Sequence, residues 1–143
     1  MSLKTDESIL KVLSAAVERH STAYQTWQYT KLWNDLDNQV QTYLCSCCNL
    51  ESKELPFLVV FVDEKTWTLI SSRAVYYAKE GMKAQTVVKD IEEIQFGDFK
   101  GVLHPLTLMH IKLKDGVVHE AAYESGKASM GVIYALQTLR QIH

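Results

Sequence analysis

The hydrophobic pattern of the chain changes at Pro56, from a helical repeat before this residue to short extended runs after it. Before Pro56, apolar residues recur every three or four positions, which is typical of helices with one buried face. Proline has no amide hydrogen and a fixed φ, so it ends a helix and opens an extended segment. The pattern therefore predicts helices within residues 1–50 and strands after residue 56.

Two N-terminal helices are predicted from separate capping signals. Asp6 is expected to cap the first helix, which continues through Ile9 and ends near His20. Thr22 and Gln25 have capping-box spacing, so a second helix is expected to begin there. Together the two helices form a predicted hairpin, with the second buried on one side against its own domain. The apolar stripe of the second helix is the strongest periodic signal in the chain and consists of Tyr29, Leu32, Trp33, Leu36, Val40, Tyr43, Leu44 and Cys47.

Seven short β-rich runs follow, separated by polar and glycine-containing turns. Connections this short join antiparallel neighbours, because a parallel crossover needs about a dozen residues or more. We therefore expect one antiparallel meander over residues 57–123. Its first run does not alternate, which predicts that the sheet's core covers one face and the N-terminal helices cover the other. The runs are 57–62, 67–71, 73–78, 86–89, 91–96, 106–113 and 117–123.

The turn around Lys114, Asp115 and Gly116 sets the register of the last hairpin. A two-residue turn would place Glu120 opposite Ile111. A three-residue loop with Gly116 in the left-handed region instead pairs His110 with Glu120. We prefer the three-residue loop because it keeps a carboxylate off the apolar face.

The pattern becomes helical again after this hairpin. Ser125 is the expected cap of a helix over residues 125–142, and Gly126 and Gly131 are expected to weaken it and to allow a close approach to the sheet. Its buried face is Val132, Ile133, Leu136 and Leu139. The expected fold is a single α+β domain over residues 1–143. It consists of the helical hairpin (1–50), a seven-stranded antiparallel sheet or partly open barrel (57–123) and a C-terminal capping helix (125–142).

Composition and charge narrow the class of protein. With 47% apolar and 22% charged residues, the 143-residue chain has the composition of a globular domain. Fifteen basic and seventeen acidic residues give a net charge of −2, and no basic block is present, so nucleic-acid binding is not expected. The longest apolar run is far shorter than the roughly 20 residues that span a bilayer, so no membrane span is expected.

The cysteines bear on location and on metal binding. Cys45, Cys47 and Cys48 form one cluster with no distant partner, which argues against a disulfide framework and fits a reducing compartment. The N-terminus also lacks the uninterrupted apolar stretch of a signal peptide, so we expect a cytoplasmic protein. Tetrahedral zinc needs a fourth ligand, and none follows at usable spacing, so no metal site is expected.

The sequence offers few candidate catalytic or ligand-binding residues. His110 and Glu120 form a predicted cross-strand pair that could perform acid–base chemistry, although such pairs on sheet surfaces usually only stabilise the fold. Strand aromatics could line a pocket but more often fill a core; they are Trp67, Tyr76, Tyr77 and Phe96. Because no short catalytic or cofactor-binding motif is present, neither catalysis nor a cofactor is expected.

Seven short strands followed by one closing helix resemble the pleckstrin-homology-like (PH-like) superfold, with the closest local match to its bacterial PH-like and GRAM-like branches. The resemblance is carried by residues 67–77, 88–94, 113–117 and the final helix, and it spans roughly residues 57–140. It implies a binding platform for proteins, peptides or lipids. Phosphoinositide-binding members use dense basic residues around the first hairpin, whereas this chain has only Lys65 and Arg73 there. Phosphoinositide binding is therefore not expected.

The sequence predicts a non-catalytic PH-like interaction domain for a protein or peptide partner. The alternative is a small enzyme or ligand-binding protein with a pocket between the helical pair and the sheet. Tyr24 and Trp27 lie off the main stripe, so they either cover the first helix or form part of a partner surface. A homodimer also stays open, through the second helix or a sheet edge. The candidate surface residues are Tyr24, Trp27, Lys65, Arg73, His110 and Glu120.

Overall fold

The computed structural model describes residues 5–20, 27–100 and 104–143, which form an α+β fold with two antiparallel sheets. One sheet has five strands in the order β1-β2-β3-β4-β5, and the other has three in the order β6-β7-β8. The 3₁₀ turns η2 (Trp33–Asp35) and η3 (Val88–Asp90) follow β1 and β5. The helices are α1 (Asp6–His20), α2 (Asn38–Cys47) and α3 (Lys127–Ile142). The strands are β1 (Thr30–Leu32), β2 (Pro56–Asp63), β3 (Thr66–Ser71), β4 (Ala74–Lys79), β5 (Met82–Val87), β6 (Ile91–Gln95), β7 (Leu106–Leu113) and β8 (Val118–Glu124).

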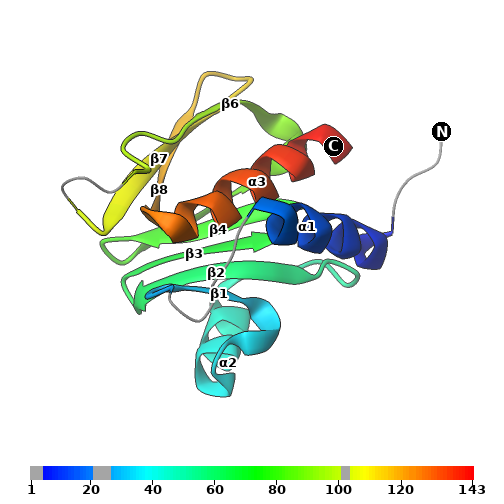
Figure 1. The fold of residues 1–143 in the computed structure, drawn as a ribbon, viewed down its shortest axis with the longest axis horizontal. Coiled ribbons are helices and arrows are strands. Elements are labelled where there is room, and N and C mark those ends of the chain that lie inside the picture. Colours follow the sequence, from blue (N-terminus) through cyan, green and yellow to red (C-terminus); the bar gives the residue numbers. More distant parts are fainter. Residues whose placement is uncertain (1–4, 21–26, 101–103) are drawn as a thin grey trace.

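The helices lie on both faces of the five-stranded sheet (Figure 1). Helices α1 and α3 pack side by side over one face, and α2 lies against the opposite face. The three-stranded sheet contacts the first sheet through β8, which packs against β3 and β4. The Thr68 hydroxyl donates a hydrogen bond of 2.6 Å to the Ala122 carbonyl at this contact.

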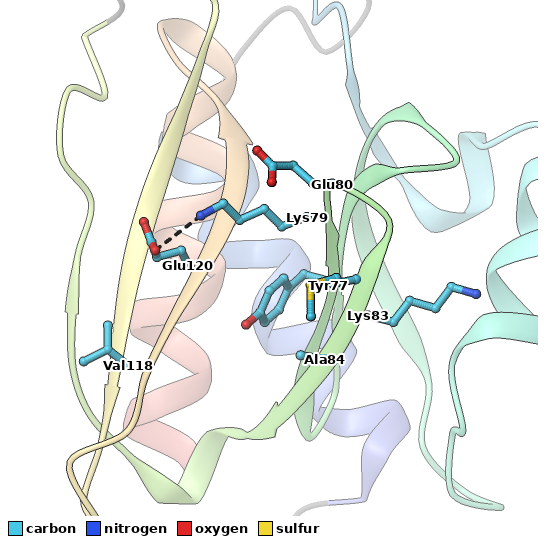
Figure 2. Close-up of a pocket in the computed structure, with 8 residues that line it drawn as sticks. Tyr77, Lys79, Glu80, Lys83, Ala84, Val118 and Glu120 are labelled. Carbon is cyan, nitrogen blue, oxygen red and sulfur yellow. Dashed lines mark ion pairs between the residues drawn. The ribbon is translucent and has the colours of Figure 1, made fainter.

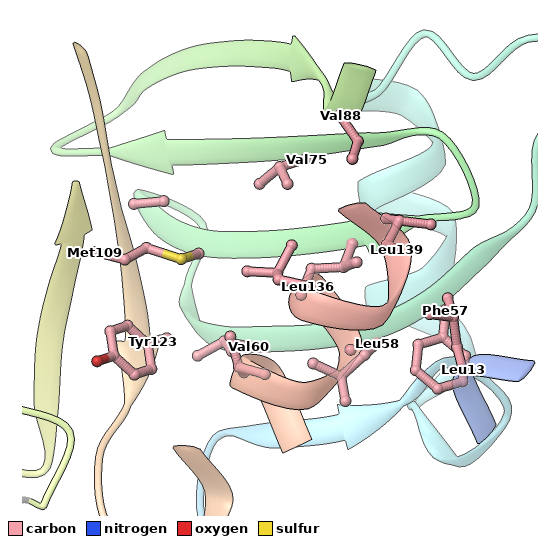
Figure 3. Close-up of a cluster of buried hydrophobic side chains, with 14 of the residues drawn as sticks. Leu13, Phe57, Leu58, Val60, Val75, Val88, Met109, Tyr123, Leu136 and Leu139 are labelled. Atoms are coloured by element: carbon pink, nitrogen blue, oxygen red, sulfur yellow. The ribbon is translucent and has the colours of Figure 1, made fainter. Parts of the chain in front are cut away.

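Two apolar clusters follow from this layering. Along β2, Leu58 and Val60 point into a cluster shared with α1, α3 and the three-stranded sheet (Figure 3). Val59 points into a second cluster, which contains Leu44 of α2 and Trp67 of β3. Both faces of β2 are therefore covered, as its continuous apolar run predicts.

The predicted helical hairpin is wrong. After α1, Thr30–Leu32 forms a strand that pairs antiparallel with β2, and the second helix begins only at Asn38. Asp37 caps that helix by accepting a hydrogen bond of 2.8 Å from the Gln39 amide. The apolar stripe divides between the two clusters because the chain crosses the edge of the sheet there: Leu32 packs with the first cluster and Leu36 with the second. The predicted Thr22–Gln25 capping box lies outside the described residues.

The prediction of one seven-stranded sheet is also wrong. The chain bends at η3, so β6 leaves the first sheet and starts the second. The fourth predicted run, residues 86–89, corresponds to a strand that begins at Met82 and ends at Val87. The sequence missed its first four residues because an edge strand is exposed and lacks a continuous apolar pattern. The other six runs match observed strands within one residue at each end.

The predicted caps were assigned to the wrong residues. Thr5, rather than Asp6, caps α1, because its hydroxyl accepts a hydrogen bond of 3.1 Å from the Ser8 amide. Ser125 does not cap α3; its hydroxyl instead donates to the His104 carbonyl at 2.7 Å. The residue at the N-terminal boundary of α3 is Gly126, with a φ of 76°.

The predicted register of the last hairpin is confirmed. Gly116 has a φ of 94°, in the left-handed region, and His110 pairs directly with Glu120 across β7 and β8. Met109 and Ile111 are fully buried on the opposite face of β7. Within the described ranges, no helix is both long and apolar enough to cross a membrane.

Candidate functional site

A cleft lies where the β4–β5 hairpin of the first sheet faces β8 of the second (Figure 2). Its volume is about 310 Å³, at the lower end of the range of roughly 300–1,000 Å³ for ligand pockets. Because both sheets line it, the cleft exists only once they have packed together. The lining residues are Tyr77, Lys79, Glu80, Met82, Lys83, Ala84, Val118 and Glu120.

A tight turn shapes the mouth of the cleft. Glu80 and Gly81 have φ values of 52° and 83°, and positive φ at both central residues characterises a type I′ turn, whose twist matches that of a hairpin. The Gly81 amide donates a hydrogen bond of 3.0 Å to the Lys65 carbonyl, so this turn is tied to the β2–β3 turn. Lys79 and Met82, which pair across the hairpin, are thereby held at the cleft.

Two side-chain bridges join the sheets beside the cleft. The Tyr77 hydroxyl lies 2.6 Å from Nδ1 of His119, and their rings meet edge to face with centroids 5.6 Å apart. Lys79 Nζ lies 3.3 Å from a Glu120 carboxylate oxygen. Burial raises the pKa of Tyr77, so its hydroxyl stays protonated at neutral pH and acts as a hydrogen-bonding group rather than a nucleophile.

His110 and Glu120 are brought together as the sequence predicts. His110 Nε2 lies 3.1 Å from the second carboxylate oxygen of Glu120, and both side chains are nearly half exposed. Hydrogen bonds from Lys79 and then His110 hold the pKa of Glu120 below its usual value. A carboxylate already engaged by two partners, and open to water, suits a surface ion-pair network better than proton abstraction.

Exposed apolar side chains border the cleft on both sides. Met82 on β5 is 78% exposed and Val118 on β8 is 54% exposed, and both line the cleft. Val87, at the far end of β5, and Val117, next to Val118, are 38% and 49% exposed. Among the described residues, these four are the large apolar side chains that folding leaves open to solvent. Apolar surface gathered around a groove is typical of interaction sites.

Lys65 and Arg73 are not brought together. They flank opposite ends of β3, which by its length separates them by on the order of 20 Å. Arg73 forms a bidentate pair with Asp6, at 2.9 Å from Nε and 2.8 Å from a terminal nitrogen, and a second ion pair with Glu51. Its charge therefore fastens the start of α1 to the β3–β4 turn.

The sequence left open whether Trp27 covers the first helix or forms part of a partner surface, and the structure buries it. It is 4% exposed and packs in the first cluster with α1 residues such as Leu13, so it does not form a partner surface. Its ring lies so close to Gly131 of α3 that a Cβ at that position would come within 2.8 Å of it. The sequence predicted that Gly131 would allow a close approach to the sheet, but the neighbour that it approaches is Trp27. Tyr24 lies outside the described residues.

The remaining candidates lie outside the lining of the cleft. Cys45 is exposed, while Cys48 is buried, and burial raises the pKa of the Cys48 thiol to about 12. No cluster that could hold a metal ion occurs in the part of the chain that is described. Trp67 and Tyr76 fill the second core cluster. Helices α1 and α2 lie on opposite faces of the first sheet, so they do not form the helical pair that was expected to bound a pocket.

Two carboxylates are buried away from the cleft. Glu54 accepts hydrogen bonds from Tyr76 and Ser71, and Glu124 accepts them from the backbone just before and within β1. Both are less than a tenth exposed, and neither is anticipated by the sequence pattern. Except for the Glu51 amide, which donates to Glu54 at 3.0 Å, their partners lie at least 17 positions away in the chain, so the local sequence pattern gives little sign of these contacts.

Comparison of the chain with protein-family models, with curated proteins and with solved structures finds no match. Of the predicted surface residues, Glu120 lines the cleft and His110 lies within hydrogen-bonding distance of Glu120. The sequence missed Lys79, Met82 and Val118, for which the only signal was a position beside a glycine-containing turn.

Proposed function

We propose that the protein is a non-catalytic PH-like interaction domain and that the cleft between β5 and β8 binds a segment of a protein or peptide partner. The observation that carries this proposal is the exposed apolar rim. Met82 and Val118 stand on opposite sides of one cleft and remain more than half exposed. Burying such side chains against a partner releases free energy in proportion to the apolar area covered.

The order of the elements supports the PH-like part of the proposal. Strands β2 to β8 are seven consecutive strands, antiparallel within each of the two sheets, and α3 follows them directly. This is the order on which the resemblance rests. The N-terminal region adds α1, β1 and α2 around that unit, so it contributes to the packing of both faces of the first sheet.

The charges favour a polypeptide over an anionic headgroup. Lys79 at the cleft is already paired with Glu120, and Arg73 is paired with two carboxylates elsewhere. A phosphate-rich ligand would need several converging cations, whereas the cleft presents mixed charge between apolar side chains. A mixed surface with an apolar centre and a polar rim resembles the anatomy of a protein interface.

A peptide selection on the full chain tests the proposal. A random peptide library displayed on phage is selected against the immobilised protein, and the enriched peptides are titrated by calorimetry. We expect Met82→Asp and Val118→Asp each to weaken binding about tenfold or more, because each puts a charge where apolar contact is needed. Gln137→Asp, on the exposed side of α3, is the matched control and should bind normally. Failure to enrich any peptide, or equal binding by all three variants, would contradict the proposal.

A further inference from the structure

We propose that the partner binds by strand addition, with an extended segment pairing along the free edge of β5 as a sixth strand of the first sheet. This inference rests on the proposed function, because it specifies how the partner occupies the same cleft. It assigns part of the binding energy to backbone hydrogen bonds as well as to apolar contact.

The cleft lies over one face of the β4–β5 hairpin, where Tyr77 and Lys79 of β4 line it, and it extends to the edge of β5. Three consecutive residues of this strand, Met82, Lys83 and Ala84, all line it. Side chains alternate between the two faces of a strand, so a groove over one face alone would skip every second residue. Figure 2 shows the Lys83 side chain pointing away from the cleft, so Lys83 contributes its backbone.

The outward backbone groups of β5 are available for pairing. Strand β5 ends the order of the first sheet, and the pair Lys79 and Met82 directly flanks a two-residue turn. Such flanking residues exchange hydrogen bonds with each other, and the alternation along the ladder then turns the amide and carbonyl of Lys83 and Gln85 outward. In the described residues, no hydrogen bond reaches these outward groups. An open edge of this kind is a template for another strand.

The side chains around the edge define the chemistry of the added strand. On the cleft side, Ala84 pairs with Tyr77 across the hairpin and lies two residues from Met82 on the same strand face, while Val118 lines the other sheet's wall. The small Ala84 side chain leaves room for an apolar side chain there. On the other side, Lys83 is exposed and has no ion-pair partner among the described residues, so an acidic side chain suits the position across from it. The inferred ligand is therefore an extended segment in which apolar and acidic residues alternate.

Amide hydrogen exchange with a defined probe tests strand addition. The probe is the capped peptide acetyl-Thr-Val-Glu-Val-Glu-Val-Thr-amide. It is added to the full chain until the NMR chemical shifts of the protein no longer change. We expect the exchange of the Lys83 and Gln85 amides to slow at least tenfold. The amide of Ala84 already faces β4 and should change little, so it serves as the internal reference.

Backbone methylation of the probe separates strand addition from side-chain docking. Methylating the amides of one set of alternate residues should abolish binding, because those amides pair with β5, whereas methylating the other set should leave it intact. In the protein, Gln85→Pro removes one outward amide at an edge, where proline is tolerated, and should weaken binding by the same mechanism. The spectrum of this variant shows whether the fold is retained.

Each remaining outcome overturns a distinct claim. If peptides bind in the cleft without slowing exchange at Lys83 and Gln85, and if both methylated probes bind equally, strand addition is wrong while the interaction site stands. If neither the probe nor any selected peptide binds, the proposed function fails as well. If light scattering shows a dimer whose Lys83 and Gln85 amides are already protected, a second copy occupies the edge, and the inference of a partner segment is overturned.

Discussion

The carboxylate of Glu124 accepts two hydrogen bonds from Thr30, one from its amide at 2.9 Å and one from its hydroxyl at 2.8 Å, across 94 positions of the chain. The same carboxylate also accepts hydrogen bonds from the amides of Gln28 and Tyr29, each at 2.8 Å. Glu124 is the last residue of β8 and is 8% exposed. This one side chain therefore connects the entry to β1 with the three-stranded sheet.

Replacing this carboxylate should destabilise the protein. In Glu124→Gln, one oxygen becomes an amide group that faces donors, so buried backbone amides lose their acceptor. We expect the free energy of unfolding to fall by about 1–3 kcal/mol, measured by urea denaturation, with faster amide exchange at Tyr29 and Thr30. Glu93→Gln, at an exposed position of β6, should change stability by less than about 0.5 kcal/mol. Equal denaturation midpoints for the two variants would show that the Glu124 contacts contribute little.

The Asp6–Arg73 pair predicts a specific dependence on pH. The hydrogen bond from Arg73 lowers the pKa of Asp6 below its ordinary value of 3.8. A lowered folded pKa contributes stability that is complete above the ordinary value and is lost as the pH falls through the folded value. At neutral pH we expect Asp6→Asn to lower the free energy of unfolding by about 1–3 kcal/mol. The difference in the free energy of unfolding between the variant and the wild type should narrow only below about pH 4. A difference that stays constant down to about pH 2 would refute this assignment.

Gly131 is predicted to be required at its position in α3. Alanine is favoured over glycine in a helix by about 1 kcal/mol, but here a Cβ would meet the buried ring of Trp27 at 2.8 Å. Because overpacking costs about 1–3 kcal/mol, we expect Gly131→Ala to destabilise the protein despite its higher helix propensity. Combining it with Trp27→Phe should cost less than the sum of the two single changes. Strict additivity, or a stabilised Gly131→Ala, would show that the ring moves aside freely.

The three cysteines should differ in reactivity. Because the thiolate is the reactive form and the Cys48 thiol has a pKa raised to about 12 by burial, Cys48 should resist iodoacetamide at about pH 8 in the folded protein. Cys45, which is exposed, should be alkylated first. Mass spectrometry of the labelled fragments measures the order, and addition of urea should make Cys48 as reactive as Cys45. Early labelling of Cys48 without urea would mean that the end of α2 opens readily.

The features that were predictable from the sequence depend on residues close together in the chain. The change to extended structure at Pro56, the bounds of most strands and the helical character of α1 and α3 all follow from the local spacing of apolar residues. The pairing of His110 with Glu120 follows from a single glycine, because Gly116 in the left-handed region determines the length of the loop. In each case the information lies within about one turn or one hairpin.

The features that were mispredicted depend on contacts between distant segments. Residues 29–36 have a helical repeat, yet β1 forms there because β2 and the Glu124 carboxylate offer its backbone better partners than a helix would. The break between β5 and β6, and hence the cleft between Met82 and Val118, likewise requires two sheets to meet. Periodicity reports which side of an element is apolar, but the partner of that side is selected by packing across the whole fold, where hydrogen bonds and buried area outweigh local propensity.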